Sequence, residues 1–185
     1  DTVHTAHGRA IPFATGIKLA RPELNVIVIT GDGDCTAIGG NHFLHGCRRN
    51  VDLTVILFNN NIYGMTGGQM APTTLIGQKT ATCPYGRDPE LHGYNLNITE
   101  LASHLKGTCY VTRQSVDTVA SINKAKRAIR KAFEASMQGK GSSLVEIVAT
   151  CNSGWKLTPV KANEWMRENM FPEYQKGDLK DTTGL

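Results

Sequence analysis

The stretch Asn25-Val26-Ile27-Val28-Ile29-Thr30-Gly31-Asp32-Gly33-Asp34 decides the fold of this 185-residue chain. Residues 26–30 are all apolar or β-branched, and a glycine-rich turn with two carboxylates follows them at once. A short apolar run bounded by a turn is typical of a strand that lies buried in a parallel sheet with helices on both faces. We therefore predict a strand over residues 25–30 that ends at the edge of such a sheet.

Three further runs have the character of buried strands, at residues 53–58, 108–112 and 143–148. Residues 36–49 have the length of a helix between the first two strands, which predicts a βαβ unit. Apolar residues at a 3.6-residue period over 122–136 predict an amphipathic helix that ends before Gly139. The chain as a whole is predicted to be α/β, a mostly parallel sheet with helices on both faces.

The domain organisation follows from composition along the chain. Residues 63–94 are rich in glycine, proline and threonine and are predicted to form a long loop, which is typically either functional or disordered. The polar segment after Trp165 is predicted to be an extended arm, so that a single domain spans residues 1–165 and the arm spans 166–185. The chain opens at Asp1 without Met or a leader-like segment, which favours a processed or truncated chain.

Composition excludes several classes of protein. The chain has 20 Lys and Arg against 16 Asp and Glu, a net charge of +4 that is too mild to indicate nucleic-acid binding. No apolar run approaches the ~20 residues of a membrane span, so no membrane association is expected. The five cysteines never form a CxxC pair, which favours a reducing compartment and a cytoplasmic location.

The turn Gly31–Asp34 indicates a site for an anion that is bound together with a metal ion. It joins a strand to a helix, where free backbone N–H groups and the helix dipole favour a phosphate group. Asp32 and Asp34 would repel a bare diphosphate. A divalent cation, Mg²⁺, is therefore expected to bridge the carboxylates and the diphosphate. Thr36 stands where the dinucleotide fingerprint requires a third glycine, which leaves an NAD-dependent dehydrogenase as a weaker alternative.

Asn60 supplies a second candidate ligand for this cation. It follows the strand at 53–58, and ligands gather at the carboxyl ends of neighbouring parallel strands. An amide oxygen of Asn60 and a nearby backbone carbonyl would complete the metal shell with Asp32. The alternative is that Asn59-Asn60-Asn61 is simply a turn.

Gly31-Asp32-Gly33, with Asn60 placed 28 positions after Asp32 (60 − 32), resembles the thiamine-diphosphate motif of thiamine-dependent enzymes. Longer motifs narrow this resemblance. They are His7-Gly8-Arg9-Ala10, Ile38-Gly39-Gly40-Asn41-His42 and Asn60-Asn61-Ile62-Tyr63-Gly64-Met65-Thr66-Gly67-Gly68-Gln69. From about His4 to about Trp165 the chain resembles the β subunit of 2-oxoacid:ferredoxin oxidoreductases, nearest to the 2-oxoglutarate oxidoreductase (2-oxoglutarate synthase) subgroup. The fold implied is the diphosphate-binding domain of thiamine-diphosphate enzymes.

The resemblance also implies roles for individual residues. Mg²⁺ would be held by the side chains of Asp32 and Asn60 and by the backbone carbonyl of Ile62. The residues implied to contact the thiamine diphosphate are Gly31, Asp32, Gly33, Asp34, Cys35, Asn60, Ile62, Tyr63, Gly64, Met65 and Thr66. His7 and Arg9 match a motif near the active centre and are the candidate catalytic residues, but Arg9 alternatively ties the N-terminal arm to the sheet. Cys151 matches a cluster ligand, with a buried structural thiol as the alternative.

The activity implied is oxidative decarboxylation of a 2-oxo acid to acyl-CoA, with electrons passed to ferredoxin. An α subunit would carry the pyrimidine-binding domain, which 185 residues cannot add. A [4Fe–4S] cluster is expected only with an N-terminal segment that would precede Asp1 and carry the other cysteines. Branched-chain or pyruvate-type oxidoreductases, and a non-catalytic diphosphate-binding assembly module, remain as alternatives.

Overall fold

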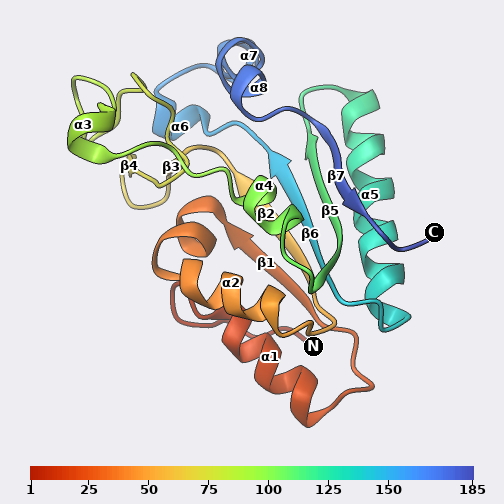
Figure 1. The fold of residues 1–185 in the computed structure, drawn as a ribbon. Coiled ribbons are helices and arrows are strands. Elements are labelled where there is room, and N and C mark those ends of the chain that lie inside the picture. Colours follow the sequence, from red (N-terminus) through yellow and green to blue (C-terminus); the bar gives the residue numbers. More distant parts are fainter.

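A computed structural model describes residues 1–185 and is built around a five-stranded sheet of order β1-β2-β6-β5-β7 (Figure 1). Four strands of this sheet, β1, β2, β6 and β5, run parallel, and β7 pairs antiparallel with β5. Their bounds are β1 (Ile27–Gly31), β2 (Thr54–Asn59), β5 (Thr108–Ser115), β6 (Ser142–Val148) and β7 (Gly177–Asp181). The prediction of an α/β fold with a mostly parallel sheet is confirmed.

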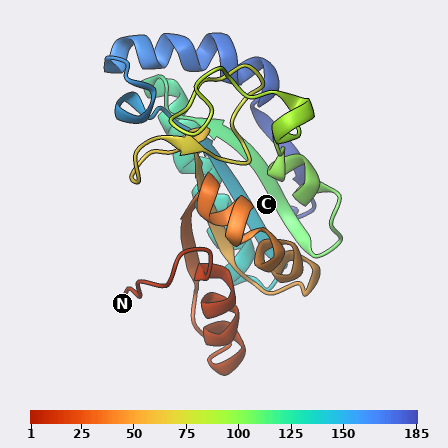
Figure 2. The same cartoon turned by 90° about the vertical axis from the view of Figure 1, so that its left-hand side faces the viewer.

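Helices cover the two faces of the sheet, as predicted (Figure 2). On one face lie α1 (Ala10–Ala20), α2 (Gly40–Arg48) and α4 (Ile98–Ser103), and on the other lies α5 (Val119–Met137). Phe43 and Leu57 belong to the core on the first face, while Ala132 and Val145 belong to the core on the α5 face. None of the helices has the combination of length and apolar character that crossing a membrane requires.

The outer strand β1 differs from its prediction. Ile27 is 45% exposed and Ile29 is 70% exposed, whereas Val28 between them is buried. The cause is position in the sheet, because β1 is an edge strand and α5 packs on β5, β6 and β2. The prediction that this strand is covered on both faces is therefore wrong.

Between the strands, two segments have irregular structure. The helix predicted at 36–49 consists of a π-helical turn, η1 (Asp34–Ile38), followed by α2. Residues 63–94 are mostly loop, as predicted. This loop includes parts of the small hairpin β3 (Ile62–Tyr63) and β4 (Gln69–Met70), and the short helix α3 (Pro89–His92).

A buried arginine joins distant parts of the long loop to one another. Arg87 is buried and donates hydrogen bonds to the backbone carbonyls of Pro72 at 2.8 Å, Thr74 at 2.7 Å and Tyr94 at 2.7 Å. Buried polar groups need such partners, and here carbonyl oxygens replace an acidic side chain. Residues 72–74 and residue 94 of the loop are therefore bonded to the same side chain.

The C-terminal segment is not an extended arm. It contains α6 (Asn152–Trp155), α7 (Pro159–Trp165), a second π-helical turn η2 (Met166–Met170), α8 (Phe171–Glu173) and β7. Met166, Met170 and Tyr174 are fully buried and pack against Leu75 and Val148. The predicted boundary at residue 165 is wrong because three large side chains spaced along a polar segment are enough to dock it on the sheet.

Asp117 joins this C-terminal segment to the start of α5. It accepts hydrogen bonds from the Ser115 hydroxyl at 2.6 Å and the Arg167 guanidinium at 3.1 Å, and the Lys176 ammonium lies 3.9 Å away. Burial favours the neutral acid, but the hydrogen bonds from Ser115, Ser121 and Arg167 and the charge of Lys176 outweigh it and lower the pKa of Asp117 to about 2.

We expect Asp117→Asn to lower the free energy of unfolding at pH 7 by about 1–2 kcal/mol. A carboxyl whose pKa is depressed in the folded state stabilises above its unfolded pKa near 4, and this contribution is lost as the pH falls toward 2. Urea unfolding at pH 7 and at pH 3 measures the difference, which should shrink at the lower pH. Glu168→Gln, at an exposed carboxylate in η2, is the control and should change little. An equal loss in both variants would contradict the prediction.

Candidate cofactor site at the carboxyl ends of β1 and β2

The turns that follow β1 and β2 lie side by side. Gly31 pairs with Phe58 in the parallel register, so Asp32 and Asn60 both follow at the same edge of the sheet. The Tyr63 hydroxyl donates a hydrogen bond to the Gly33 carbonyl at 3.1 Å and so joins the two turns directly. The structure thus brings together the two motifs that the sequence predicts to form one site.

Asp32 is a buried carboxylate, with 2% of its surface exposed. The Thr73 hydroxyl donates to its Oδ2 atom, and the Thr36 hydroxyl donates to its backbone carbonyl at 2.6 Å. Burial raises the pKa of Asp32 to about 6, against the opposing effect of the hydrogen bonds from Thr73 and from the backbone N–H of Gly33. A cation at this carboxylate would offset the cost of burying its charge.

Asn60 presents a buried amide oxygen, Oδ1, that has no hydrogen-bond partner. Its backbone carbonyl is already taken, because the indole N–H of Trp155 donates to it at 3.1 Å. Buried polar atoms are rarely left unpaired, so this oxygen is suited to a ligand. A carboxylate, an amide oxygen and the Ile62 carbonyl are the hard oxygen donors that Mg²⁺ prefers. No three His, Cys, Asp or Glu side chains come together as a metal site by themselves.

Gly33 lies directly beneath the ring of Tyr63. A Cβ atom at this position would lie 2.2 Å from the ring of Tyr63, so a larger residue would displace that ring. Gly33 is also the N-cap residue of the π-helical turn η1, and backbone N–H groups at the start of a helix lack partners within it. These residues fit an anionic group next to a cation.

Asp34 is engaged by the N-terminal segment. Its Oδ1 atom accepts a hydrogen bond from the backbone N–H of Gly8 at 2.5 Å and lies 2.7 Å from Nδ1 of His7. The Thr30 hydroxyl donates to its Oδ2 atom at 2.7 Å. The half-exposed His7 is therefore placed beside the turn. The Arg9 guanidinium donates to the Ile38 carbonyl at 3.2 Å, which favours the alternative that Arg9 ties down the N-terminal segment.

Three predicted residues have less contact with the site. The side chain of Cys35 is buried in the core beside α2, where burial raises the pKa of its thiol, so only its backbone can face a ligand. Met65 is fully exposed. The exposed Thr66 is hydrogen-bonded through its hydroxyl to Gln69, at 2.6 Å, in the same loop.

Cys151 packs against the turn that follows β2. A Cβ atom at Gly64 would lie 2.6 Å from its Sγ atom, and one at Gly154 would lie 2.8 Å from it. The thiol is only partly buried, whereas the other four cysteines are buried. Cys151 thus lies next to the residues predicted to hold the cofactor.

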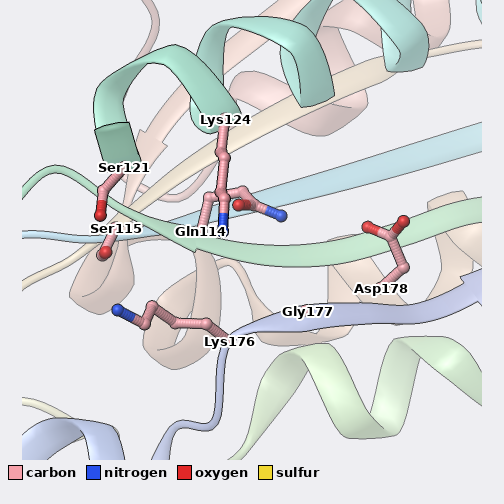
Figure 3. A pocket seen from close by; sticks show the side chains of 7 residues that line it. All are labelled: Gln114, Ser115, Ser121, Lys124, Lys176, Gly177 and Asp178. Carbon is pink, nitrogen blue, oxygen red and sulfur yellow. The ribbon is translucent and has the colours of Figure 1, made fainter. Parts of the chain in front are cut away.

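Thr73 and Trp155 touch the site but were not predicted from the sequence. They contact Asp32 and the Asn60 carbonyl from the long loop and from α6, which no local motif indicates. A separate polar cavity of about 230 Å³ contains none of the predicted site residues (Figure 3). It is lined by Gln114, Ser115, Ser121, Lys124, Lys176, Gly177 and Asp178.

Comparison with known proteins identifies the class to which this fold and site belong. Residues 1–147 match the family model "Thiamine pyrophosphate enzyme, C-terminal TPP binding domain". The chain is 49% identical over 169 residues to 2-oxoglutarate synthase subunit KorB of Archaeoglobus fulgidus, which covers 91% of this chain and 59% of the relative. It is 40% identical to ketoisovalerate oxidoreductase subunit VorA of Methanothermobacter thermautotrophicus, over 97% of this chain and 38% of the relative.

A solved structure supports the same assignment. The 2-oxoglutarate:ferredoxin oxidoreductase from Magnetococcus marinus, with 2-oxoglutarate, coenzyme A and succinyl-CoA bound, matches with a TM-score of 0.75 and 29% identity, over 97% of this chain and 64% of that chain. The chain belongs to the thiamine pyrophosphate enzymes and, within them, to the β subunits of 2-oxoacid:ferredoxin oxidoreductases. Among these it is most similar to the 2-oxoglutarate type. It spans about half the length of the curated relatives it matches. The predicted family and fold are confirmed.

Proposed function

We propose that this chain is part of the β subunit of a 2-oxoglutarate:ferredoxin oxidoreductase. The reaction is oxidative decarboxylation of a 2-oxo acid to acyl-CoA, with the electrons passed to ferredoxin. One observation in the molecule carries the proposal: the buried carboxylate of Asp32 and the unpartnered amide oxygen of Asn60 lie on adjoining turns. The similarity to KorB subunits supports the choice of 2-oxoglutarate.

The proposed cofactors are thiamine diphosphate and Mg²⁺. Asp32, Asn60 and the Ile62 carbonyl would hold the cation, and His7 would lie beside the cofactor turn. The residues that would contact the cofactor itself are Gly31, Gly33, Asp34, the backbone of Cys35, Tyr63, Gly64, Met65 and Thr66. Bound thiamine diphosphate supplies the carbanion stabilisation that decarboxylation of a 2-oxo acid needs. The chain's own part is to fix the position of the diphosphate and exclude water around Asp32.

The proposed partners are an α subunit with the pyrimidine-binding domain, ferredoxin, the 2-oxo acid and coenzyme A. The fully exposed Met65 and the uncovered Ile27 and Ile29 on β1 are apolar surface that a partner would cover, which supports an associated subunit. We further propose that Cys151 ligates a [4Fe–4S] cluster whose other cysteines lie outside residues 1–185. Five free thiols support a cytoplasmic location.

Calorimetric titration of the assembled complex with thiamine diphosphate, with and without Mg²⁺, tests the proposal. Binding is expected only when Mg²⁺ is present. The loaded complex should then reduce ferredoxin when 2-oxoglutarate, the source of the electrons, and coenzyme A are supplied. Tight binding without any turnover would instead favour a non-catalytic diphosphate-binding module. Binding of NAD in place of thiamine diphosphate would favour a dehydrogenase.

We expect kcat/KM for 2-oxoglutarate to exceed that for branched-chain 2-oxo acids by about tenfold or more. A site built to pair the distal carboxylate of 2-oxoglutarate is left with an unpaired cation when that carboxylate is missing. Gly67 offers no charge, and Arg9 is bonded to a carbonyl, so we expect the cation to come from the partner subunit or from a segment outside residues 1–185. Ferredoxin reduction with each substrate measures the ratio. A profile led by branched-chain acids would contradict the choice of substrate but leave the family intact.

A further inference from the structure

A fully buried carboxylate lies beneath the turn that follows β2. Glu146, on β6, accepts a hydrogen bond at its Oε1 atom from Nδ2 of Asn59 at 2.6 Å. Its Oε2 atom accepts from the buried Arg113 guanidinium at 2.6 Å and from the Thr99 hydroxyl. All three donors come from different elements, β2, β5 and α4. The charge is thus paired, and both carboxylate oxygens are occupied.

The side chain of Asn59 joins Glu146 to the turn that carries the candidate metal ligands. While its amide N–H₂ group donates to Glu146, its Oδ1 atom accepts from the backbone N–H of Asn61 at 3.1 Å. Asn61 has a positive φ of 58°, and the Thr74 hydroxyl donates to its carbonyl at 2.6 Å. Two of the three proposed metal ligands belong to Asn60 and Ile62. The backbone between them is therefore fixed by the hydrogen bonds of Asn59 and Thr74 to Asn61.

Only one orientation of the Asn59 amide satisfies both neighbours. An ionised carboxylate accepts hydrogen bonds and cannot donate them, and a backbone N–H can only donate. Glu146 therefore requires the N–H₂ group of Asn59 on its side, which leaves the oxygen for Asn61. If this amide turned over, two donors would face each other at Asn61.

We propose that Glu146 and Asn59 are positioning residues for the metal site: Glu146 orients the Asn59 amide, and Asn59 fixes the turn that presents Asn60 and Ile62 to the cation. The inference rests on the proposed function, since the cation is the Mg²⁺ bound with thiamine diphosphate. Groups that orient metal ligands without touching the metal have effects on affinity of about 10–100-fold. Glu146 and Asn59 are both fully buried, and neither is among the proposed metal ligands.

Exchanging the two side-chain types tests this chain of contacts. Glu146→Gln places an amide N–H₂ opposite that of Asn59, and Asn59→Asp places two carboxylates opposite each other. In the double variant the amide at position 146 donates to the carboxylate at position 59, whose second oxygen still accepts from Asn61. Arg113 and Thr99 retain an oxygen at position 146, and the total charge of the cluster equals that of the wild type.

We expect each single variant to weaken Mg²⁺-dependent binding of thiamine diphosphate to the assembled complex by about tenfold or more, and the double variant to bind within about threefold of wild type. Calorimetric titration measures this. In the cofactor-free complex, hydrogen exchange of a peptide covering residues 59–64 should be faster in both single variants and normal in the double variant. This readout does not depend on activity.

Thr99→Val is the matched control, because it removes another hydrogen bond to Glu146 without touching Asn59. It should lower the melting temperature but leave cofactor affinity and exchange at 59–64 unchanged. A double variant that binds as weakly as the single variants, or an equal loss of affinity in Thr99→Val, would show that Glu146 and Asn59 have only a structural role.

If Glu146→Gln does not assemble, the comparison of Asn59→Asp with the double variant still tests the proposal. Wild-type complex that fails to bind thiamine diphosphate with Mg²⁺ would overturn the proposed function itself, whereas normal binding by the single variants would overturn only this inference.

Discussion

Replacing Asp32 by asparagine is expected to weaken Mg²⁺-dependent binding of thiamine diphosphate by roughly 100-fold or more while it stabilises the ligand-free protein. The loss follows because Asp32 is the only carboxylate among the proposed ligands. The gain follows from burial, which raises the pKa of Asp32 to about 6. Between about pH 4 and pH 6 the folded state holds a proton that the unfolded state has lost, so stability falls as the pH rises through this range.

At pH 7 the ionised Asp32 therefore costs up to about 3 kcal/mol, and asparagine removes this cost while keeping an oxygen for the Thr73 hydroxyl. Thermal unfolding of the cofactor-free protein should show a higher melting temperature for Asp32→Asn. Asp34→Asn is the control, because that carboxylate accepts from Gly8 and Thr30 and faces His7, and its replacement should destabilise. A lower melting temperature for Asp32→Asn, or cofactor affinity close to wild type, would contradict the assignment.

The central strands and the two ligand-bearing turns could be predicted because their signals are local. Residues 53–58 are all apolar or β-branched, and the Asn60 turn follows at once, so pairing of the two neighbouring strands brings it close to Asp32. The cover on β1 could not be predicted in the same way. An apolar strand has the same sequence at the centre and at the edge of a sheet, and only the length and position of α5 leave Ile29 exposed.

The groups that support the site were missed because their partners lie far away in the sequence. Thr73 reaches Asp32 across 41 positions, and Asn59 reaches Glu146 across 87. The single glutamate within the predicted strand 143–148 does indicate that a buried polar cluster exists, since a charge in a buried strand must find partners. The sequence does not indicate which residues are the partners of this glutamate. The same holds for the C-terminal segment, whose buried Met166, Met170 and Tyr174 are scattered among polar residues.

Cys151→Ser in the full-length subunit is expected to remove most of the iron and the visible absorbance of the assembled complex. Loss of one of four thiolate ligands is enough to destabilise a [4Fe–4S] cluster. Serine is close to cysteine in volume, so the packing against Gly64 and Gly154 should persist. Affinity for Mg²⁺ and thiamine diphosphate should therefore stay within about threefold of wild type, and the main loss should be in electron transfer to ferredoxin.

Cys109→Ser provides the matched control for this experiment. Cys109 is buried on β5, where its thiol contacts the carbonyls of Gly141 and Ser142 at 3.5 Å. Its replacement should leave iron content unchanged, whatever it does to stability. Iron determination and ferredoxin reduction on both variants separate a ligand from a packing residue. Undiminished iron with normal electron transfer in Cys151→Ser would contradict the assignment as a cluster ligand. The Cys151 side chain would then be a packing residue, and the two glycines would lack a Cβ only because the sulfur atom occupies that space.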